Sequence, residues 1–187
     1  MKTWKTLAKR TVLDFSRFLS VESHTIELPD GRVIEDWPWV IVPDYVNVVA
    51  VTPDQEFICF RQTKYAAAGI TLAPAGGLIE PSEDPLVAAA RELREEMGLQ
   101  AGQLVSLGQY ANDGNRGVGI GYLYLALDCV PVERLPSDDL EEQEVLKLSR
   151  AEFRAALQAG EFKIMSWSAV AALALLYLDG TQNPLKD

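Results

Sequence analysis

The sequence has few of the residues that build disulfide frameworks or histidine-rich sites. Its 187 residues include two cysteines and one histidine. Cys59 and Cys129 both lie in apolar, strand-like runs, where small buried thiols are common. This placement fits a reducing, cytoplasmic compartment better than a disulfide framework. His24 lies in an expected N-terminal strand, far in sequence from the acidic motif described below, which favours a structural or exposed role.

Positive charge and long apolar runs are also scarce. The chain has 17 lysines and arginines against 27 aspartates and glutamates, for a formal charge of −10. Nucleic acids and anionic membranes need clustered basic side chains, so neither is an expected partner. The apolar run 169–178 is about half as long as a bilayer-spanning helix, and the basic segment 1–15 lacks the apolar core of a signal peptide. This charge leaves open a small anionic substrate that arrives with a metal ion.

The length and the 48% apolar composition are sufficient for one well-buried domain. A hairpin is expected over 23–42, with its turn at Pro29-Asp30-Gly31, and further strands at about 46–52, 56–62, 69–75, 103–111 and 118–129. Helices are expected at about 85–97, between Ser149 and Gly160, and at about 166–178. Strands outnumber helices and do not alternate regularly with them, which predicts an α+β fold with mixed sheets.

The helix expected at 85–97 carries three close carboxylates, those of Glu92, Glu95 and Glu96. Like charges three and four residues apart repel each other on a helix. Glu92 and Glu96 lie four apart and therefore project to one face, with Glu95 beside it. Their oxygens could surround a hard divalent cation, for which Mg²⁺ is expected and Mn²⁺ is a substitute. The plainer alternative is a solvated helix face.

Three further features belong to the same stretch. Arg91 is placed to pair with Glu95 at i, i+4, and Glu83 could reach the same arginine, so that a metal-binding carboxylate is held in orientation. Gly76 and Gly77 permit a tight turn that brings backbone carbonyls near the same cations. The stretch fits the pattern Gx5Ex7REUxEExGU, where U is apolar, at every specified position. Its seven fixed identities coincide by chance on the order of once in a billion start positions.

This pattern resembles the signature of the Nudix hydrolases. The resemblance implies an α/β/α sandwich around a mixed sheet, and hydrolysis of a nucleoside diphosphate linked to another moiety. It makes Glu92 and Glu96 metal ligands, with Glu95 shared between metal and Arg91 and the Gly76 carbonyl as a further ligand. The metal ions would neutralise the pyrophosphate and activate the attacking water.

A weaker resemblance covers about residues 4–178 and rests on LPDG at 28–31, FRQTKY at 60–65 and an acidic segment before EVLKLS. It points to the ADP-ribose and nucleotide-sugar pyrophosphatase branch. It implies that residues 1–45 form an N-terminal β extension for homodimerisation and substrate binding, and that 46–187 form the Nudix hydrolase domain. Arg61 and Lys64 occupy positions of phosphate-contacting residues. The candidates for stacking on a base, or alternatively for core or interface packing, are Trp4, Trp37 and Trp39.

The group that activates water is expected in the acidic run 138–144, since related enzymes place a catalytic glutamate there. Glu141 is the first choice and Asp139 the second. The leading hypothesis is a metal-dependent pyrophosphohydrolase that releases a nucleoside monophosphate and a sugar phosphate. Two alternatives stay open: a Nudix enzyme acting on nucleoside triphosphates or dinucleoside polyphosphates, and a non-catalytic nucleotide-sensing domain. Asn115 stands where the branch often has a proline, and the base and sugar stay undefined.

Overall fold

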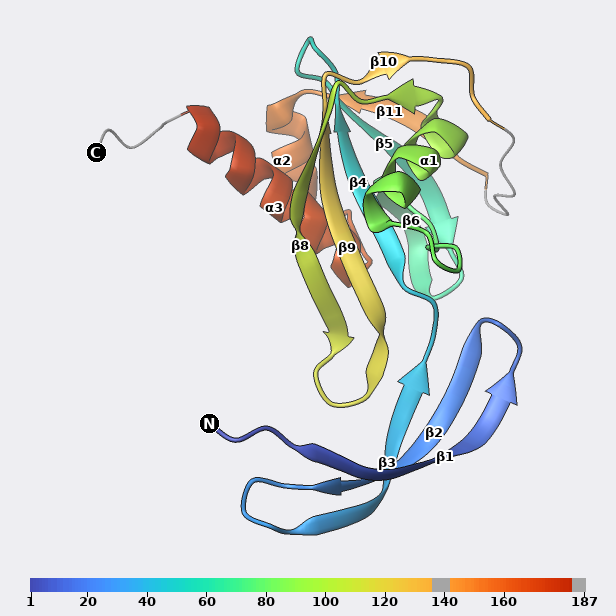
Figure 1. Cartoon of the computed structure of the whole chain (residues 1–187). Helices are drawn as coiled ribbons and strands as arrows, with labels where there is room; N and C mark the ends of the chain where they lie inside the picture. Colours follow the sequence, from blue (N-terminus) through green and yellow to red (C-terminus); the bar gives the residue numbers. More distant parts are fainter. Residues whose placement is uncertain (136–141, 183–187) are drawn as a thin grey trace. The chain divides into compact units, whose positions relative to one another are not determined.

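The structure, a computed structural model, describes residues 1–135 and 142–182 (Figure 1). The chain divides into two compact units. Unit 1 comprises residues 1–44 and 110–121, and unit 2 comprises 45–109 and the residues from 122 onward. The segment 110–121, which lies far along the chain from the N-terminus, therefore belongs to the same unit as the N-terminal strands.

Unit 1 is built on three antiparallel strands: β1 (Lys5–Phe15), β2 (Leu19–Glu27) and β3 (Val33–Ile41). The predicted hairpin turn is confirmed between β2 and β3, where Gly31 adopts a φ of 85° and its N–H donates to the Leu28 carbonyl at 2.9 Å. The start of β9 (Gly117–Leu127) joins β3 in parallel at the Val40–Gly117 pair. Strand β1 was not anticipated, because two register shifts along it interrupt the simple alternation of apolar and polar residues.

Unit 2 has a mixed sheet whose strands run in the order β9, β4 (Tyr45–Val51), β5 (Phe57–Lys64) and β11 (Glu144–Leu148). Two more strands extend it, since β6 (Ala67–Ala73) pairs with β5 and β8 (Gln103–Asp113) pairs with β9. Strands β7 (Leu99–Gln100) and β10 (Val130–Pro131) form a separate small ladder. Strand β5 is the central element, because it pairs antiparallel with β4, β6 and β11.

Both faces of the unit 2 sheet are covered by helices. On one face, Val48 and Ala50 of β4 pack in a buried cluster with α1 (Pro85–Met97). On the other, Val49 and Val51 of the same strand pack with α2 (Arg150–Gln158) and α3 (Met165–Gln182). Successive residues of a strand point to opposite faces, so β4 contributes side chains to both buried clusters. The predicted α/β/α sandwich with a mixed sheet is confirmed.

Local capping residues fix the helix that carries the acidic motif. The Asp84 side chain accepts a hydrogen bond from the Leu86 N–H at 2.9 Å, and Gly98 ends the helix with a φ of 61°. Helix α1 therefore has the predicted limits. The predicted capping box of Ser149 and Glu152 is also present at the start of α2, whereas α3 is longer than expected. Within the described part of the chain, every helix is too short or too polar to cross a bilayer.

Candidate functional site

Helix α1 turns two carboxylates inward. Glu92 and Glu96 are only 8% and 7% exposed, while Glu95 beside them is half-buried. The four-residue spacing puts the two buried side chains on one helix face, as predicted. Burying carboxylates is unfavourable unless charges or hydrogen bonds compensate for the lost water. The surroundings of this face must therefore supply that compensation.

Arg91 compensates three of the carboxylates around the helix. Its Nη1 donates to Glu92 Oε1 at 2.7 Å and to Glu95 Oε2 at 2.9 Å. Its Nε and Nη2 donate to the two oxygens of Glu83 at 2.8 and 2.9 Å, and Nη2 also reaches the Leu78 carbonyl at 3.1 Å. These hydrogen bonds, led by the one to Glu83, raise the pKa of Arg91, and the bond from Arg91 lowers the pKa of Glu83. One guanidinium thus fixes the orientation of three acids.

The glycine pair brings backbone against the same carboxylates. The Gly76 N–H donates to Glu96 Oε2 at 2.7 Å. A methyl group built on Gly77 would overlap the Glu92 carboxylate, and one built on Gly76 would overlap the Val46 carbonyl oxygen. The segment is held along β4 by hydrogen bonds from Val46 N–H to the Gly77 carbonyl and from Val48 N–H to the Ala75 carbonyl. A side chain at position 76 would meet fixed backbone, whereas one at position 77 would force the Glu92 carboxylate out of its place.

Asn47 is a buried polar residue beside the glycine pair that sequence reasoning missed. It is 4% exposed, and its Nδ2 has no hydrogen-bond partner among the described residues. A side chain on Gly76 would meet its Oδ1 at 2.8 Å, so Asn47 lies directly beside the glycine pair. The available signal was a single polar residue inside the apolar run VNVVAV, since a buried amide requires a partner or a role.

The donor chemistry at this face suits a hard divalent cation. Carboxylate and backbone carbonyl oxygens are the ligands that Mg²⁺ takes in proteins. Over residues 1–135 and 142–182, no three acidic, histidine or cysteine side chains are grouped closely enough to enclose an ion. Instead, Arg91 engages Glu92 and Glu95, and the Gly76 N–H engages Glu96. The oxygen ligands are of the types that suit Mg²⁺. In this structure the carboxylates contact the Arg91 guanidinium and the Gly76 N–H.

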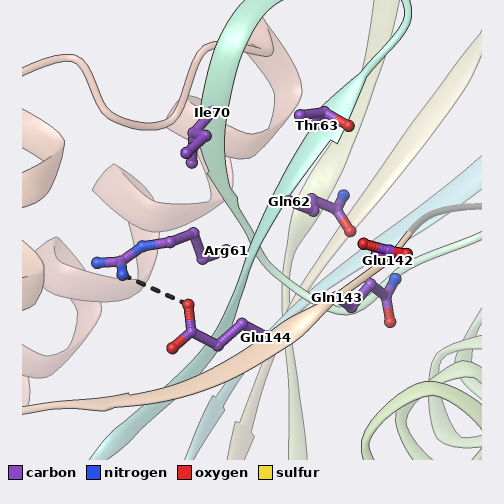
Figure 2. Close-up of a pocket in the computed structure, with 7 residues that line it drawn as sticks. All are labelled: Arg61, Gln62, Thr63, Ile70, Glu142, Gln143 and Glu144. Carbon is purple, nitrogen blue, oxygen red and sulfur yellow. Dashed lines mark hydrogen bonds and ion pairs between the residues drawn. The ribbon is translucent and has the colours of Figure 1, made fainter.

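The basic residues predicted to contact phosphate lie on β5. Arg61 contributes to a pocket with its neighbours Gln62 and Thr63, Ile70 of β6 and residues 142–144 (Figure 2). Its Nη1 lies 3.4 Å from Glu144 Oε2, and both side chains are about half exposed or more. Lys64 is half-buried at the end of β5, where it pairs with Ala67.

The predicted stacking residues all lie in unit 1. Trp4 and Trp37 pack edge to face with ring centroids 5.4 Å apart, and Trp39 stacks on His24 at the same centroid distance. The Trp37 indole N–H donates to the Asn115 carbonyl at 2.7 Å. His24 is 8% exposed and hydrogen-bonded to Glu22 at 2.8 Å, which excludes the exposed placement and leaves the structural role as the prediction.

The two residues predicted to activate water, Glu141 and Asp139, lie outside the described residues. Two acids of the same run are described. Glu144 begins β11 opposite Arg61, and Glu142 lines the pocket beside β5. The acidic run therefore leads into strand β11, which was not predicted from the sequence.

Comparison with known families identifies the motif. Residues 41–168 match the NUDIX domain family, and residues 4–40 match the family described as "Nucleoside diphosphate sugar hydrolase N-terminal domain". The chain belongs to the Nudix hydrolase family. The N-terminal strands of this Nudix hydrolase fall largely within the second match, and the acidic helix falls within the first.

Individual relatives of this Nudix hydrolase span nearly its whole length. A CMP-5'-(N-acetyl-N-hydroxy-3-aminopropyl)phosphonate hydrolase of Streptomyces rubellomurinus is 29% identical over 96% of this chain and 85% of the relative. The ADP-ribose pyrophosphatase of Bacillus subtilis is 26% identical over 93% of this chain and 91% of the relative. A crystal structure of an ADP compounds hydrolase is 25% identical and aligns over 97% of both chains with a TM-score of 0.80.

These matches confirm the predicted family, fold and reaction class. The Nudix hydrolase is a pyrophosphohydrolase of the kind that cleaves nucleoside diphosphate derivatives. Nudix hydrolases generally use divalent metal ions, in agreement with the donor chemistry of α1. The sheet architecture expected from the resemblance agrees with that of the ADP compounds hydrolase.

The Glu83–Arg91 pair is expected to make the stability of this Nudix hydrolase depend on pH. The pKa of Glu83 lies below its ordinary value of 4.5, chiefly because of the Arg91 hydrogen bond. A carboxylate with a lowered pKa stabilises the fold above its unfolded pKa, and this contribution is lost as the pH falls through the folded pKa. We therefore expect Glu83→Gln to lower the thermal unfolding midpoint at neutral pH, and the difference from wild type to shrink as the pH falls from about 5 to about 3.

Thermal unfolding followed by circular dichroism across this pH range measures the effect. Glu80→Gln is the matched control, since Glu80 is an exposed acid of the same loop. A difference between wild type and Glu83→Gln that stays constant with pH would contradict the expected role of the pair.

Proposed function

We propose that this Nudix hydrolase cleaves the pyrophosphate of a nucleoside diphosphate joined to a sugar or sugar-like moiety, giving a nucleoside monophosphate and a sugar phosphate. The observation that carries the proposal is the pair of buried carboxylates, Glu92 and Glu96, held between Arg91 and the Gly76 amide. Support for the substrate class comes from the match of residues 4–40 to nucleoside diphosphate sugar hydrolases and from the ADP-ribose pyrophosphatase relative.

Mg²⁺ is the proposed ion, with Mn²⁺ as a substitute. Glu92, Glu95, Glu96 and the Gly76 carbonyl would hold it, since all four supply hard oxygen ligands. When bound, such an ion neutralises diphosphate charge and lowers the pKa of a coordinated water. The protein's own contribution is to orient the three carboxylates on a capped helix, with Gly76 held against it by the hydrogen bond to Glu96.

Arg91 and Glu83 are proposed as positioning residues for this face. Arg91 reaches both Glu92 and Glu95, and its planar fork restricts how far these carboxylates can turn. Glu83 in turn holds the other edge of the guanidinium through two oxygens. Loss of either residue would let the helix carboxylates separate under their mutual repulsion.

The remaining assignments follow the sequence. Glu141, and next Asp139, are proposed to activate the attacking water. Arg61 and Lys64 of β5 are proposed to contact the substrate, and Trp4, Trp37 and Trp39 of unit 1 are proposed to contact its base. A cytoplasmic location is proposed because Cys59 and Cys129 are free, buried thiols.

Product analysis tests the reaction. Purified protein with Mg²⁺ should convert ADP-ribose or a nucleoside diphosphate sugar into a nucleoside monophosphate and a sugar phosphate, detected by anion-exchange chromatography. Pyrophosphate or longer phosphate chains released from nucleoside triphosphates or dinucleoside polyphosphates would favour the alternative enzyme. Absence of turnover on the whole panel, with nucleotide binding retained, would favour a sensing domain.

Glu96→Gln tests the role of the buried helix face. The amide keeps the shape of the side chain and an oxygen that can accept from the Gly76 N–H, so the fold should persist. It lacks the negative charge that a divalent cation requires, so kcat should fall by about two orders of magnitude or more. Steady-state kinetics on the wild type, Glu96→Gln and the exposed control Glu80→Gln measure this, and near-normal turnover in Glu96→Gln would reject the assignment.

A second copy of this chain is the proposed partner of unit 1. Strand β1 lies at the edge of the sheet, pairs with β2, and is exposed along its whole length. Its exposed apolar side chains include Leu13 and Phe15, which are 45% and 68% accessible. A long edge strand with apolar side chains is unfavourable in a monomer, because it leaves unpaired backbone groups and an apolar surface in water. Covering it with a second unit 1 would remove both costs.

Replacing both Leu13 and Phe15 with aspartate should give a monomer. Wild type is expected to sediment at twice the chain mass of 20.6 kDa at micromolar concentration, measured by analytical ultracentrifugation. Val87→Asp is the matched control, because Val87 is an exposed apolar residue of α1 in unit 2. A monomeric wild type would reject the proposed dimer.

A further inference from the structure

A pocket of about 370 Å³ opens beside β5, at the lower end of the range of about 300–1,000 Å³ typical of small-molecule sites. The register of the sheet explains its position. Pairing of β5 with β11 stops at Arg61, which lies opposite Glu144, the first residue of β11. The residues of β5 after Arg61 therefore have no partner in β11. Residues 142 and 143, which precede β11, form the opposite wall. The pocket therefore lies beside the part of β5 that extends past the first residue of β11.

Gln62 supplies a buried polar group to this pocket. Its side chain is 6% exposed, and its Oε1 has no hydrogen-bond partner within the part of the chain that the structure describes. A buried acceptor without a donor is rare in folded proteins and calls for a ligand or another explanation. Figure 2 shows the Gln62 carboxamide on the same side of β5 as the side chains of Glu142 and Gln143.

The charges of the lining residues indicate which kind of ligand fits. Arg61 is paired with Glu144 and points to the other side of β5 in Figure 2. On the side of Gln62, the carboxylate of Glu142 adds two more acceptor oxygens. Acceptor groups attract hydrogen-bond donors and repel anions, so this side of the pocket suits an uncharged group, and the phosphate of a bound ligand would lie outside it. A hydroxyl-rich neutral group matches these requirements.

We propose that this pocket binds the hydroxylated moiety of the substrate, with a hydroxyl donating to Gln62 Oε1. This inference rests on the proposed function and deepens it, because it assigns a residue to the half of the substrate that leaves as a sugar phosphate. Gln62 then acts as a specificity-determining residue: it favours leaving groups that carry hydroxyls over those that do not. A buried acceptor discriminates in this way because a ligand without a donor leaves it unpaired.

Direct binding tests the proposal without requiring turnover. Isothermal titration of the full-length wild type with ribose 5-phosphate and with methyl phosphate separates the contribution of the hydroxyls from that of the phosphate. Ribose 5-phosphate should bind at least about tenfold more tightly than methyl phosphate, the discrimination of a single good hydrogen bond. Equal affinities, or no binding of ribose 5-phosphate at millimolar concentration, would overturn the proposal.

Gln62→Met gives the second arm, since methionine has similar length but offers no strong acceptor. The variant should lose the preference for ribose 5-phosphate and keep the wild-type affinity for methyl phosphate. Its unfolding midpoint without ligand should equal or exceed that of wild type, because Oε1 has no protein partner to lose. Gln103→Met, at an exposed position on β8, is the matched control.

Two results would contradict the role of Gln62. One is an unchanged preference in Gln62→Met, and the other is a marked drop in its unfolding midpoint, which would indicate a structural role. Failure of the proposed function looks different: ribose 5-phosphate would still bind through Gln62, while no nucleotide substrate on the panel would be hydrolysed.

Discussion

Charge balance on helix α1 is the constraint on which the site depends. The helix carries acids at spacings that repel, and two of them face inward. Arg91 makes this arrangement tolerable, because a single guanidinium contacts Glu83, Glu92 and Glu95. Glu96 is held separately by a backbone amide. The acids are therefore fixed in place while their combined charge exceeds that of the arginine, which leaves the face suited to a doubly charged ion.

Strand β4 supports this arrangement because the backbone of residues 75–77 lies directly against it. Hydrogen bonds tie residues 75–77 to β4, and the two glycines leave room for the Glu92 carboxylate and the Val46 carbonyl. Strand β4 also contributes side chains to both buried clusters of unit 2. A change in this strand would thus disturb the packing of the sandwich and the position of the acidic helix together.

Much of the site could be predicted because its determinants are local. Asp84, Pro85 and Gly98 define the limits of α1, and the four-residue spacing of its acids defines their shared face. Strands β1 and β11 were missed, since irregular register in one and charged residues in the other hide the alternating pattern. The burial of Asn47 and Gln62 was not predicted either, because it arises only when distant segments come together.

The division of the chain has a consequence for exchanging parts between relatives. Unit 1 is assembled from two separate stretches, and the indole of Trp37 in the first donates to the carbonyl of Asn115 in the second. A chimaera that replaces residues 1–44 alone would combine N-terminal strands from a relative with residues 110–121 of this chain, where β8 turns into β9. A chimaera that preserves the contacts of the N-terminal sheet must therefore include residues 110–121 from the same parent.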